Sequence, residues 1–173
     1  IDACPGMCLF CSFARGHTRF QPAAMDLDEV IASTRAFAES GDLYALFLMT
    51  MHEFSFDRLA ETVVRLRELM PDKPQIVVNV GDFDRARAEA LAQAGVHGAY
   101  HVLRLREGED TALDPEARLA TVKAIREAGL DWYYCCEPVG PEHGPEELVE
   151  QMFLGVELGC FQHAAMRRVY IPG

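Results

Sequence analysis

The stretch Gln75-Ile-Val-Val-Asn-Val80 is mostly apolar and rich in β-branched residues, and a helical pattern over Phe83–Ala94 follows it and stops at Gly95. Continuous apolar runs of this length are typical of strands that are buried on both faces, as in parallel sheets. A glycine directly after a helical pattern marks the end of a helix. The stretch therefore predicts one strand that leads into one helix, the repeating unit of α/β folds.

The same unit recurs along the chain. The helices are expected at about Leu27–Ser40, Phe56–Met70, Phe83–Ala94, Asp114–Gly129 and Pro145–Gly159, and the strands at Tyr44–Met51, Gln75–Val80, Ala99–Leu105, Asp131–Glu137 and His163–Ile171. A further strand is expected to end just before Cys4. Asp26 can cap the first helix, with Glu29 three residues later as in a capping box. Asp114 followed by Pro115 is a cap with a first-turn proline, which marks the start of the fourth helix.

Units of roughly thirty residues without linkers predict parallel strands joined by right-handed crossovers. A full eight-fold barrel needs about 250 residues, whereas this chain has 173. We therefore expect an α/β fold of the TIM type, present as a partial (β/α) barrel of about five to six βα units. Residues 1–173 would form a single domain, truncated at both ends. An open doubly wound sheet is the alternative, and in both folds the active-site residues belong at the carboxyl ends of the strands.

Composition excludes several classes of protein. Half of the residues are hydrophobic, which excludes a disordered chain, and no apolar run is long enough to cross a bilayer. The formal net charge is −11 with no cluster of Lys and Arg, which argues against a nucleic-acid partner. Regular helices and strands do not fit a disulfide-stapled secreted domain. The composition favours a cytoplasmic protein with reduced cysteines and without a membrane or nucleic-acid partner.

Three of the six cysteines lie within eight residues, in Cys4-Pro-Gly-Met-Cys8-Leu-Phe-Cys11. Thiolates are soft ligands that suit iron–sulfur clusters or zinc. Three of them on one short loop can bind three corners of an iron–sulfur cubane and leave the fourth iron without a protein ligand. His17 lies six residues beyond Cys11, so a structural Cys₃His zinc site is the alternative.

The spacing Cys-x-x-x-Cys-x-x-Cys, with Phe10 before the last cysteine and βα repeats after it, resembles the radical SAM superfamily. The resemblance implies a [4Fe–4S] cluster on Cys4, Cys8 and Cys11, whose open iron is chelated by S-adenosylmethionine. It implies an electron donor such as ferredoxin or flavodoxin, reductive cleavage to methionine and a 5′-deoxyadenosyl radical, and hydrogen abstraction from a small-molecule substrate. It also implies that Phe10 lies near the adenine of S-adenosylmethionine.

Within the superfamily the sequence resembles the biotin-synthase-like group in three stretches. Ala117-Arg118-Leu119 implies that Arg118 binds the carboxylate of S-adenosylmethionine. Arg104-Leu-Arg-Glu107 implies that Glu107 meets the ribose hydroxyls. Glu137-Pro-Val-Gly-Pro-Glu142 occupies the place of a turn under the adenine, which makes Glu137 a candidate contact.

Two further positions are expected near the cofactor. Thr50 belongs to Thr50-Met-His-Glu53, where many members of the superfamily have Gly-Gly-Glu, whose backbone holds the methionine amino group. Val169 and Ile171 lie at the end of the last expected strand, and one of them is expected to pack on adenine. One of the adjacent Arg167 and Arg168 should face the barrel interior and hold a substrate carboxylate or phosphate.

Cys135 and Cys136 are adjacent on one expected strand, so they point to opposite faces. One interior cysteine cannot hold the second cluster of a sulfur-inserting synthase, which makes that reaction the weaker alternative. The remaining resemblance is to members that assemble small molecules: the [FeFe]-hydrogenase maturase, methylornithine synthase and the radical SAM protein of guanylylpyridinol cofactor synthesis. The expected role is therefore in cofactor biosynthesis.

Overall fold

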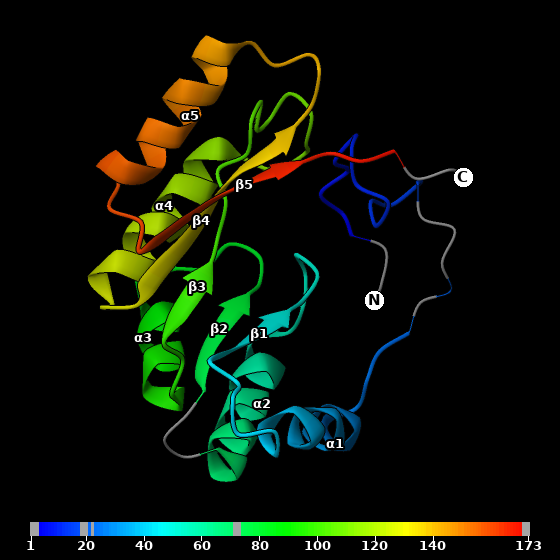
Figure 1. Cartoon of the computed structure of the whole chain (residues 1–173), viewed down its shortest axis with the longest axis vertical. Helices are drawn as coiled ribbons and strands as arrows, with labels where there is room; N and C mark the ends of the chain where they lie inside the picture. Colours follow the sequence, from blue (N-terminus) through cyan, green and yellow to red (C-terminus); the bar gives the residue numbers. More distant parts are fainter. Residues whose placement is uncertain (1–3, 18–20, 22, 71–73, 171–173) are drawn as a thin grey trace.

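The computed structural model describes residues 4–17, 21, 23–70 and 74–170. Its centre is one parallel sheet (Figure 1). The strands are β1 (Ala45–Met49), β2 (Gln75–Asn79), β3 (Gly98–Tyr100), β4 (Asp131–Val139) and β5 (Gln162–Arg167). The helices are α1 (Leu27–Ala38), α2 (Phe56–Leu69), α3 (Arg85–Ala94), α4 (Pro115–Glu127) and α5 (Pro145–Glu157). Strands and helices alternate along the chain as the sequence predicts.

The strands are hydrogen-bonded in the order β1-β2-β3-β4-β5, so their order in the sheet is their order in the sequence. All four neighbouring pairs are parallel. A doubly wound sheet would reverse its strand order at a switch point. The sequential order excludes that alternative and confirms the partial (β/α) barrel. Among the described strands, β1 and β5 are the two edges of the sheet.

Helix starts follow the predicted signals. The side chain of Asp26 accepts a hydrogen bond of 2.8 Å from the backbone N–H of Glu29, and the Glu29 carboxylate accepts one of 2.8 Å from the backbone N–H of Asp26. This reciprocal pair is the expected capping box. Asp114 accepts from the backbone N–H of Glu116 over 2.9 Å, and Pro115 occupies the first turn of α4.

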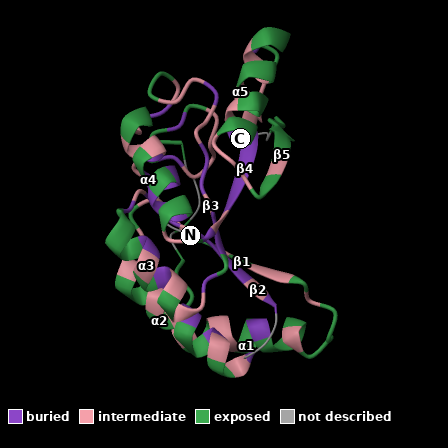
Figure 2. Cartoon of the chain, turned by 90° about the vertical axis from the view of Figure 1, so that its left-hand side faces the viewer, coloured by how far each residue is buried: buried purple, intermediate pink, exposed green. Residues whose placement is uncertain are grey.

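The hydrophobic core lies between the sheet and the helices. It includes Leu59, Val63 and Leu66 from α2, Ile76 and Val78 from β2, Leu91 from α3, Ile125 from α4, and Trp132 and Tyr134 from β4. Figure 2 shows the buried residues gathered on the middle strands and on the inner faces of the helices. Alternate residues of β4 point to the face of the sheet away from the helices. The ring of Tyr133 on that face packs edge-on against Phe47 of β1, with ring centroids 5.5 Å apart. That second face is the interior of the partial barrel.

Strand β3 is shorter than the sequence predicts, since it ends at Tyr100 instead of Leu105. The carbonyl groups of the residues that follow accept hydrogen bonds from side chains of other elements. The His101 carbonyl accepts a hydrogen bond from Nε1 of Trp132, and the Val102 carbonyl accepts two from Arg118. The chain therefore leaves the sheet early and forms a long loop before α4.

The last strand also ends earlier than expected, at Arg167. The end of its predicted range, at Ile171, lies outside the described residues, and so does the strand predicted to end before Cys4. None of the described helices combines the length and the apolar character that crossing a membrane requires.

Candidate functional site

The cysteine loop is closed on itself by backbone hydrogen bonds. The N–H of Cys4 donates to the carbonyl of Phe13 over 2.8 Å, and the N–H of Arg15 donates to the carbonyl of Cys4 over 2.8 Å. Inside the loop, the N–H of Cys11 donates to the carbonyl of Cys8 over 3.1 Å and forms a turn. All three cysteines therefore belong to one compact loop.

This loop is attached to the long loop that follows β3. The N–H of Leu9 donates to the carbonyl of Asp110 over 2.9 Å, and the N–H of Ala112 donates to the carbonyl of Gly6 over 2.7 Å. Figure 1 shows the cysteine loop, in blue, beyond the carboxyl ends of the strands. Parallel α/β folds place their active sites at this edge.

Two of the three sulfur atoms lie on the same side of Gly6. A Cβ atom added to Gly6 would lie 3.5 Å from Sγ of Cys8 and 3.6 Å from Sγ of Cys4, in ordinary van der Waals contact with both. The Cys8 side chain is buried, and burial raises the pKa of its thiol to about 11 even though the charge of Arg104 lowers it. Metal binding releases such a proton, because the ligand is the thiolate.

Among the residues that the structure describes, no three His, Cys, Asp or Glu side chains converge closely enough to hold a single metal ion. A zinc site would need four ligands within about 2.3 Å of one centre. His17 is exposed at the end of the loop. The three cysteines and His17 are therefore not gathered on one point in the described part of the chain.

A charged network lies beneath the loop. Nε of Arg104 is 3.4 Å from Oε1 of Glu137, and its Nη1 is 3.7 Å from Oε2 of Glu107. Oε2 of Glu137 accepts a hydrogen bond of 2.7 Å from the hydroxyl of Tyr100. The two glutamates predicted to contact the cofactor are thus brought together by one guanidinium, whose Nη1 is buried and has no hydrogen-bond partner among the described residues.

Glu107 is directed into the protein, with its side chain 4% exposed. One carboxylate oxygen accepts from the backbone N–H of Arg104 over 2.9 Å, and the other accepts from the hydroxyl of Thr111 over 2.8 Å. The Thr111 hydroxyl in turn accepts from the backbone N–H of Gly108 over 3.1 Å. Glu107 therefore stabilises the same loop to which the cysteines are attached.

Arg118 projects from the first turns of α4 into this network and is 2% exposed. Its Nε and Nη2 donate to the carbonyl of Val102 over 3.1 and 2.7 Å, and its Nη1 donates to Oδ1 of Asp82 over 3.0 Å. Nε also lies 3.8 Å from the Glu107 carboxylate. Because three of its five N–H groups are engaged in these bonds, the guanidinium is held in a fixed orientation.

Asp82 is the meeting point of two histidines with Arg118. Nε2 of His101 lies 3.4 Å from Oδ1, and Nε2 of His52 lies 3.8 Å from Oδ2. Burial would raise the pKa of Asp82, but the contacts with His101 and Arg118 outweigh it and lower the pKa to about 2. His101 is fully buried, and this burial together with the Arg118 charge lowers its pKa to about 3. The carboxylate is therefore charged and the His101 imidazole neutral at neutral pH.

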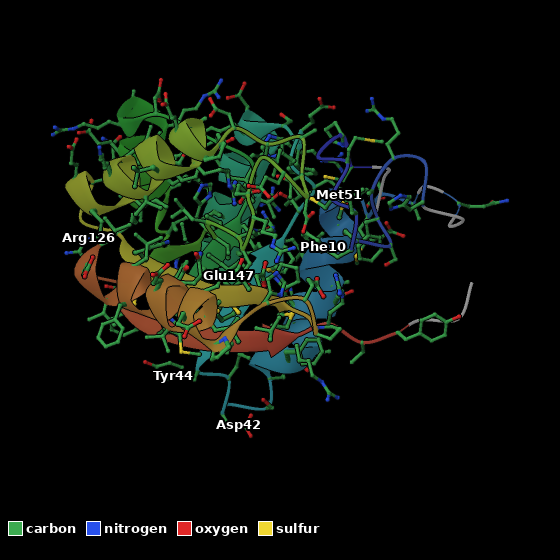
Figure 3. All side chains as sticks on the ribbon, turned by 90° about the horizontal axis from the view of Figure 1, so that it is seen from above. Phe10, Asp42, Tyr44, Met51, Arg126 and Glu147 are labelled. Atoms are coloured by element: carbon green, nitrogen blue, oxygen red, sulfur yellow. The ribbon has the colours of Figure 1, made fainter. Side chains whose placement is uncertain are left out.

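The remaining predicted contacts lie on the cysteine loop, at the end of β1 and beyond the end of β5. Thr50 donates its hydroxyl to the carbonyl of Asn79 over 2.6 Å, which joins the ends of β1 and β2. Phe10 is half-buried on the cysteine loop, and Figure 3 shows it on the same side of the molecule as Met51. Val169 is exposed beyond the end of β5.

The turn after β4 is tied to β5. Nη2 of Arg168 lies 2.7 Å from Oε2 of Glu142, and the N–H of Arg168 donates to the carbonyl of Val139 over 2.9 Å. The N–H of Gly140 donates to Nδ1 of His143 over 2.9 Å. Arg167 and Arg168 are both exposed, and Arg168 has a carboxylate partner within the protein.

The cysteines of β4 point to opposite faces, as their adjacency predicts. Cys136 shares the helix-facing side of the strand with Tyr134, against which the Cβ position of Gly155 in α5 would collide. Cys135 shares the interior face with Glu137, and both thiols are buried. Burial raises the pKa of Cys135 to about 11, so this thiol stays protonated.

Sequence reasoning missed Asp82, His101 and the full extent of the Arg104 contacts. Asp82 could have been predicted from the sequence, because it follows the buried strand Gln75–Val80 and Gly81. Active-site residues of α/β folds lie at this carboxyl end of the strands. No comparable signal marked His101, which lies inside the range that was predicted to be strand.

The sequence profile of the Radical SAM superfamily matches residues 1–151, which is most of the chain. This chain belongs to the radical SAM superfamily. Its cofactors are a [4Fe–4S] cluster and S-adenosylmethionine. No curated protein sequence matches it significantly.

Several solved structures share the fold. Methylornithine synthase superposes with a TM-score of 0.83 at 14% identity, over 96% of this chain and 50% of that protein. The [FeFe]-hydrogenase maturase of Carboxydothermus hydrogenoformans gives 0.71 at 20% identity, over 96% and 42%. A radical S-adenosylmethionine methyltransferase of Kitasatospora setae, with cobalamin and a [4Fe–4S] cluster bound, gives 0.60 at 20% identity, over 96% and 33%. This chain spans half or less of the length of each, and the likeness concerns the fold alone.

Proposed function

We propose that Cys4, Cys8 and Cys11 hold the [4Fe–4S] cluster of a radical SAM enzyme that acts on a small molecule in cofactor biosynthesis. The attachment of the cysteine loop to the carboxyl edge of the sheet, with two sulfurs beside Gly6, is the observation that carries this proposal. When bound, the reduced cluster supplies the electron that cleaves S-adenosylmethionine into methionine and a 5′-deoxyadenosyl radical. An external one-electron donor of the ferredoxin or flavodoxin class would provide that electron, in the cytoplasm.

Arg118 is proposed to bind the carboxylate of S-adenosylmethionine. Its contacts with Val102 and Asp82 support the role, since they orient the guanidinium while leaving donor capacity for another partner. Arginine pairs with carboxylates in bidentate geometry. The burial of Arg118 would strengthen such a pair, because solvent screening is weak there.

The carboxylates of Glu107 and Glu137 are proposed to meet the adenosine part of the cofactor. Each oxygen of a carboxylate has two lone pairs, so an oxygen that already accepts one hydrogen bond can accept another from a ribose hydroxyl. Phe10, Thr50 and Val169 are proposed as further contacts at the same edge. In this proposal the side chains of the protein orient the cofactor and keep water away from the radical, while the cofactor carries out the chemistry.

Anaerobic reconstitution tests the proposal. The wild-type chain should bind iron and sulfide near four per chain and form 5′-deoxyadenosine when it is reduced with dithionite in the presence of S-adenosylmethionine. Cys8→Ala should lose both the cluster and this product. Cys136→Ala is the matched control, because its thiol is equally buried but faces α5, and it should keep both.

One zinc per chain and a colourless protein would refute the proposal in favour of the structural zinc site. A second cluster in the wild-type protein would instead indicate the sulfur-inserting reaction. Equal iron content in Cys8→Ala and the wild type would remove the three cysteines from the proposed site.

A further inference from the structure

A chain of side-chain hydrogen bonds joins the carboxyl ends of four consecutive strands. The hydroxyl of Thr50, directly after β1, donates to the carbonyl of Asn79 at the end of β2 over 2.6 Å. Nδ2 of Asn79 donates to the carbonyl of Tyr100 at the end of β3 over 2.9 Å, and the Tyr100 hydroxyl donates to Oε2 of Glu137 on β4 over 2.7 Å. The hydrogen bonds thus connect two proposed cofactor contacts, Thr50 and Glu137, through Tyr100, which no part of the proposed cofactor binding uses.

Tyr100 faces the interior of the partial barrel. The register of β3 and β4 places it beside Tyr133, whose ring packs against Phe47 on the interior face. Because side chains alternate between the two faces of a strand, Glu137, four residues beyond Tyr133, lies on this face as well. The phenol of Tyr100 therefore reaches the Glu137 carboxylate across the interior face, at the carboxyl edge of the sheet.

The Tyr100 hydroxyl is a fixed hydrogen-bond donor. Burial raises the pKa of the phenol, and the negative charge of Glu137 raises it further, so the hydroxyl keeps its proton. Hydrogen bonds from a neutral donor to a carboxylate are roughly twice as strong as those between neutral groups. The bond from Asn79 to the Tyr100 carbonyl, and the bond from the N–H of His101 to the carbonyl of Tyr133, hold the backbone that carries the ring.

Glu137 is held at both carboxylate oxygens. Tyr100 donates to Oε2, and Nε of Arg104 lies 3.4 Å from Oε1. The Glu137 side chain is 12% exposed, and each of its oxygens has two lone pairs, so both can accept a further hydrogen bond. The terminal torsion of a glutamate has no sharp energy wells. Without the Tyr100 hydroxyl, the carboxylate would therefore rotate more freely.

We propose that Tyr100 is a positioning residue: it orients the Glu137 carboxylate to accept hydrogen bonds from the adenosine part of S-adenosylmethionine. This inference rests on the proposed function, in which Glu137 meets that part of the cofactor. A binding group that is already oriented loses little conformational freedom when its ligand arrives, and affinity is higher for that reason. Loss of the hydroxyl should therefore weaken binding of the adenosine part and leave binding of the methionine part unchanged.

The test measures the binding of two probes to the reconstituted protein by anaerobic equilibrium dialysis. 5′-Deoxyadenosine reports on the adenosine end of the site, and methionine reports on the other end. Tyr100→Phe keeps the ring and removes only the hydroxyl. Its affinity for 5′-deoxyadenosine should fall by about fivefold, less than for the loss of a direct hydrogen bond to a charged group. Its affinity for methionine should stay within about twofold of the wild type.

Tyr133→Phe is the matched control. It also removes a phenol hydroxyl from the interior face, but this hydroxyl donates to Oε1 of Gln75 over 3.0 Å, where β2 begins. The variant should bind both probes as the wild type does. Unchanged affinity of Tyr100→Phe for 5′-deoxyadenosine would overturn the inference. An equal loss of methionine binding, or an equal loss in Tyr133→Phe, would also overturn it, because the effect would then be a general one.

A double-mutant cycle tests whether Tyr100 acts through Glu137. Glu137→Ala should itself weaken 5′-deoxyadenosine binding, and adding Tyr100→Phe should weaken it by less than about twofold more, because the hydroxyl then has no carboxylate to orient. Fully additive losses would contradict the proposal. If Glu137→Ala does not fold, the comparison of the two probes in Tyr100→Phe decides alone. Failure of the proposed function is distinguishable, because the reconstituted wild type would then bind neither probe.

Discussion

Nη1 of Arg118 and Oδ1 of Asp82 form a hydrogen-bonded ion pair of 3.0 Å between residues 36 positions apart. The pair joins the segment after β2 to the first turns of α4. Arg118 also holds the carbonyl of Val102 after β3, so one side chain ties together the ends of two strands and a helix. The orientation of the residue proposed to bind S-adenosylmethionine is thus set by a carboxylate that belongs to another βα unit.

Asp82→Asn should lower the free energy of unfolding by about 3 kcal/mol, because it removes the nearer of the two carboxylates beside the buried Arg118 charge and leaves only Glu107 at 3.8 Å. Urea unfolding at neutral pH measures the change. Glu89→Gln is the control, since Glu89 pairs with Arg85 over 2.8 Å on the surface. Exposed pairs contribute about 1 kcal/mol or less. Equal losses of unfolding free energy in the two variants would show that the Asp82–Arg118 pair stabilises the protein no more than an exposed ion pair does.

Acid should destabilise the protein through His101. Its folded-state pKa of about 3 lies below the 6.5 of an unfolded histidine, so the unfolded chain binds more protons between these values. This contribution to stability is complete above pH 6.5 and is lost as the pH falls toward 3. From pH 7 to pH 5 it amounts to about 2 kcal/mol. Denaturation curves of His101→Gln at the two pH values should show a fall smaller by this amount, and identical falls would contradict the burial of a neutral imidazole.

Gly81→Ala should cost about 1–3 kcal/mol of stability, because a Cβ at this position would overlap the backbone carbonyl of His52. The close approach brings the segment after β1 onto the end of β2. Gly144→Ala is the comparison, since no atom lies within 4 Å of its Cβ position. It should cost less than about 1 kcal/mol as a helix N-cap change. Thermal or urea unfolding distinguishes the two, and a harmless Gly81→Ala would mean that the two loops can separate freely.

Arg118→Lys should weaken the binding of S-adenosylmethionine by about tenfold or more, because charge-assisted hydrogen bonds of a bidentate arginine contribute about 1.5–3 kcal/mol. Anaerobic equilibrium dialysis against the reconstituted protein measures the affinity, and the iron content should stay at the wild-type value. Arg126→Lys, on the last turn of α4, should bind as the wild type does. Unchanged affinity in Arg118→Lys would remove this arginine from the proposed cofactor site.

The sequence was sufficient to predict the elements whose signals are local. Asp26 with Glu29 and Asp114 with Pro115 marked helix starts correctly, because caps depend on neighbouring residues alone. The run Gln75–Val80 identified a buried strand that ends within one residue of the structure. Repetition of such units was enough to predict the parallel, partial barrel.

The parts that sequence reasoning could not predict depend on distant partners. Nothing near Tyr100 signals that β3 ends there, because the carbonyls of His101 and Val102 are taken by Trp132 and Arg118. The same is true of Arg104, whose guanidinium lies 3.4 Å from the carboxylate of Glu137, more than thirty residues farther along the chain. Local sequence patterns show where polar side chains lie along the chain, but the arrangement of the strands determines which of these side chains come into contact.

The bonds from Gly6 to Ala112 and from Leu9 to Asp110 have a consequence for how the enzyme matures. Each joins segments separated by roughly one hundred residues, so the intervening polypeptide must be in place before the bond can form. The proposed cluster loop therefore takes its final position only once the segment around residues 110–112 has folded against it. On this proposal, the cluster would be inserted into a chain that is already folded.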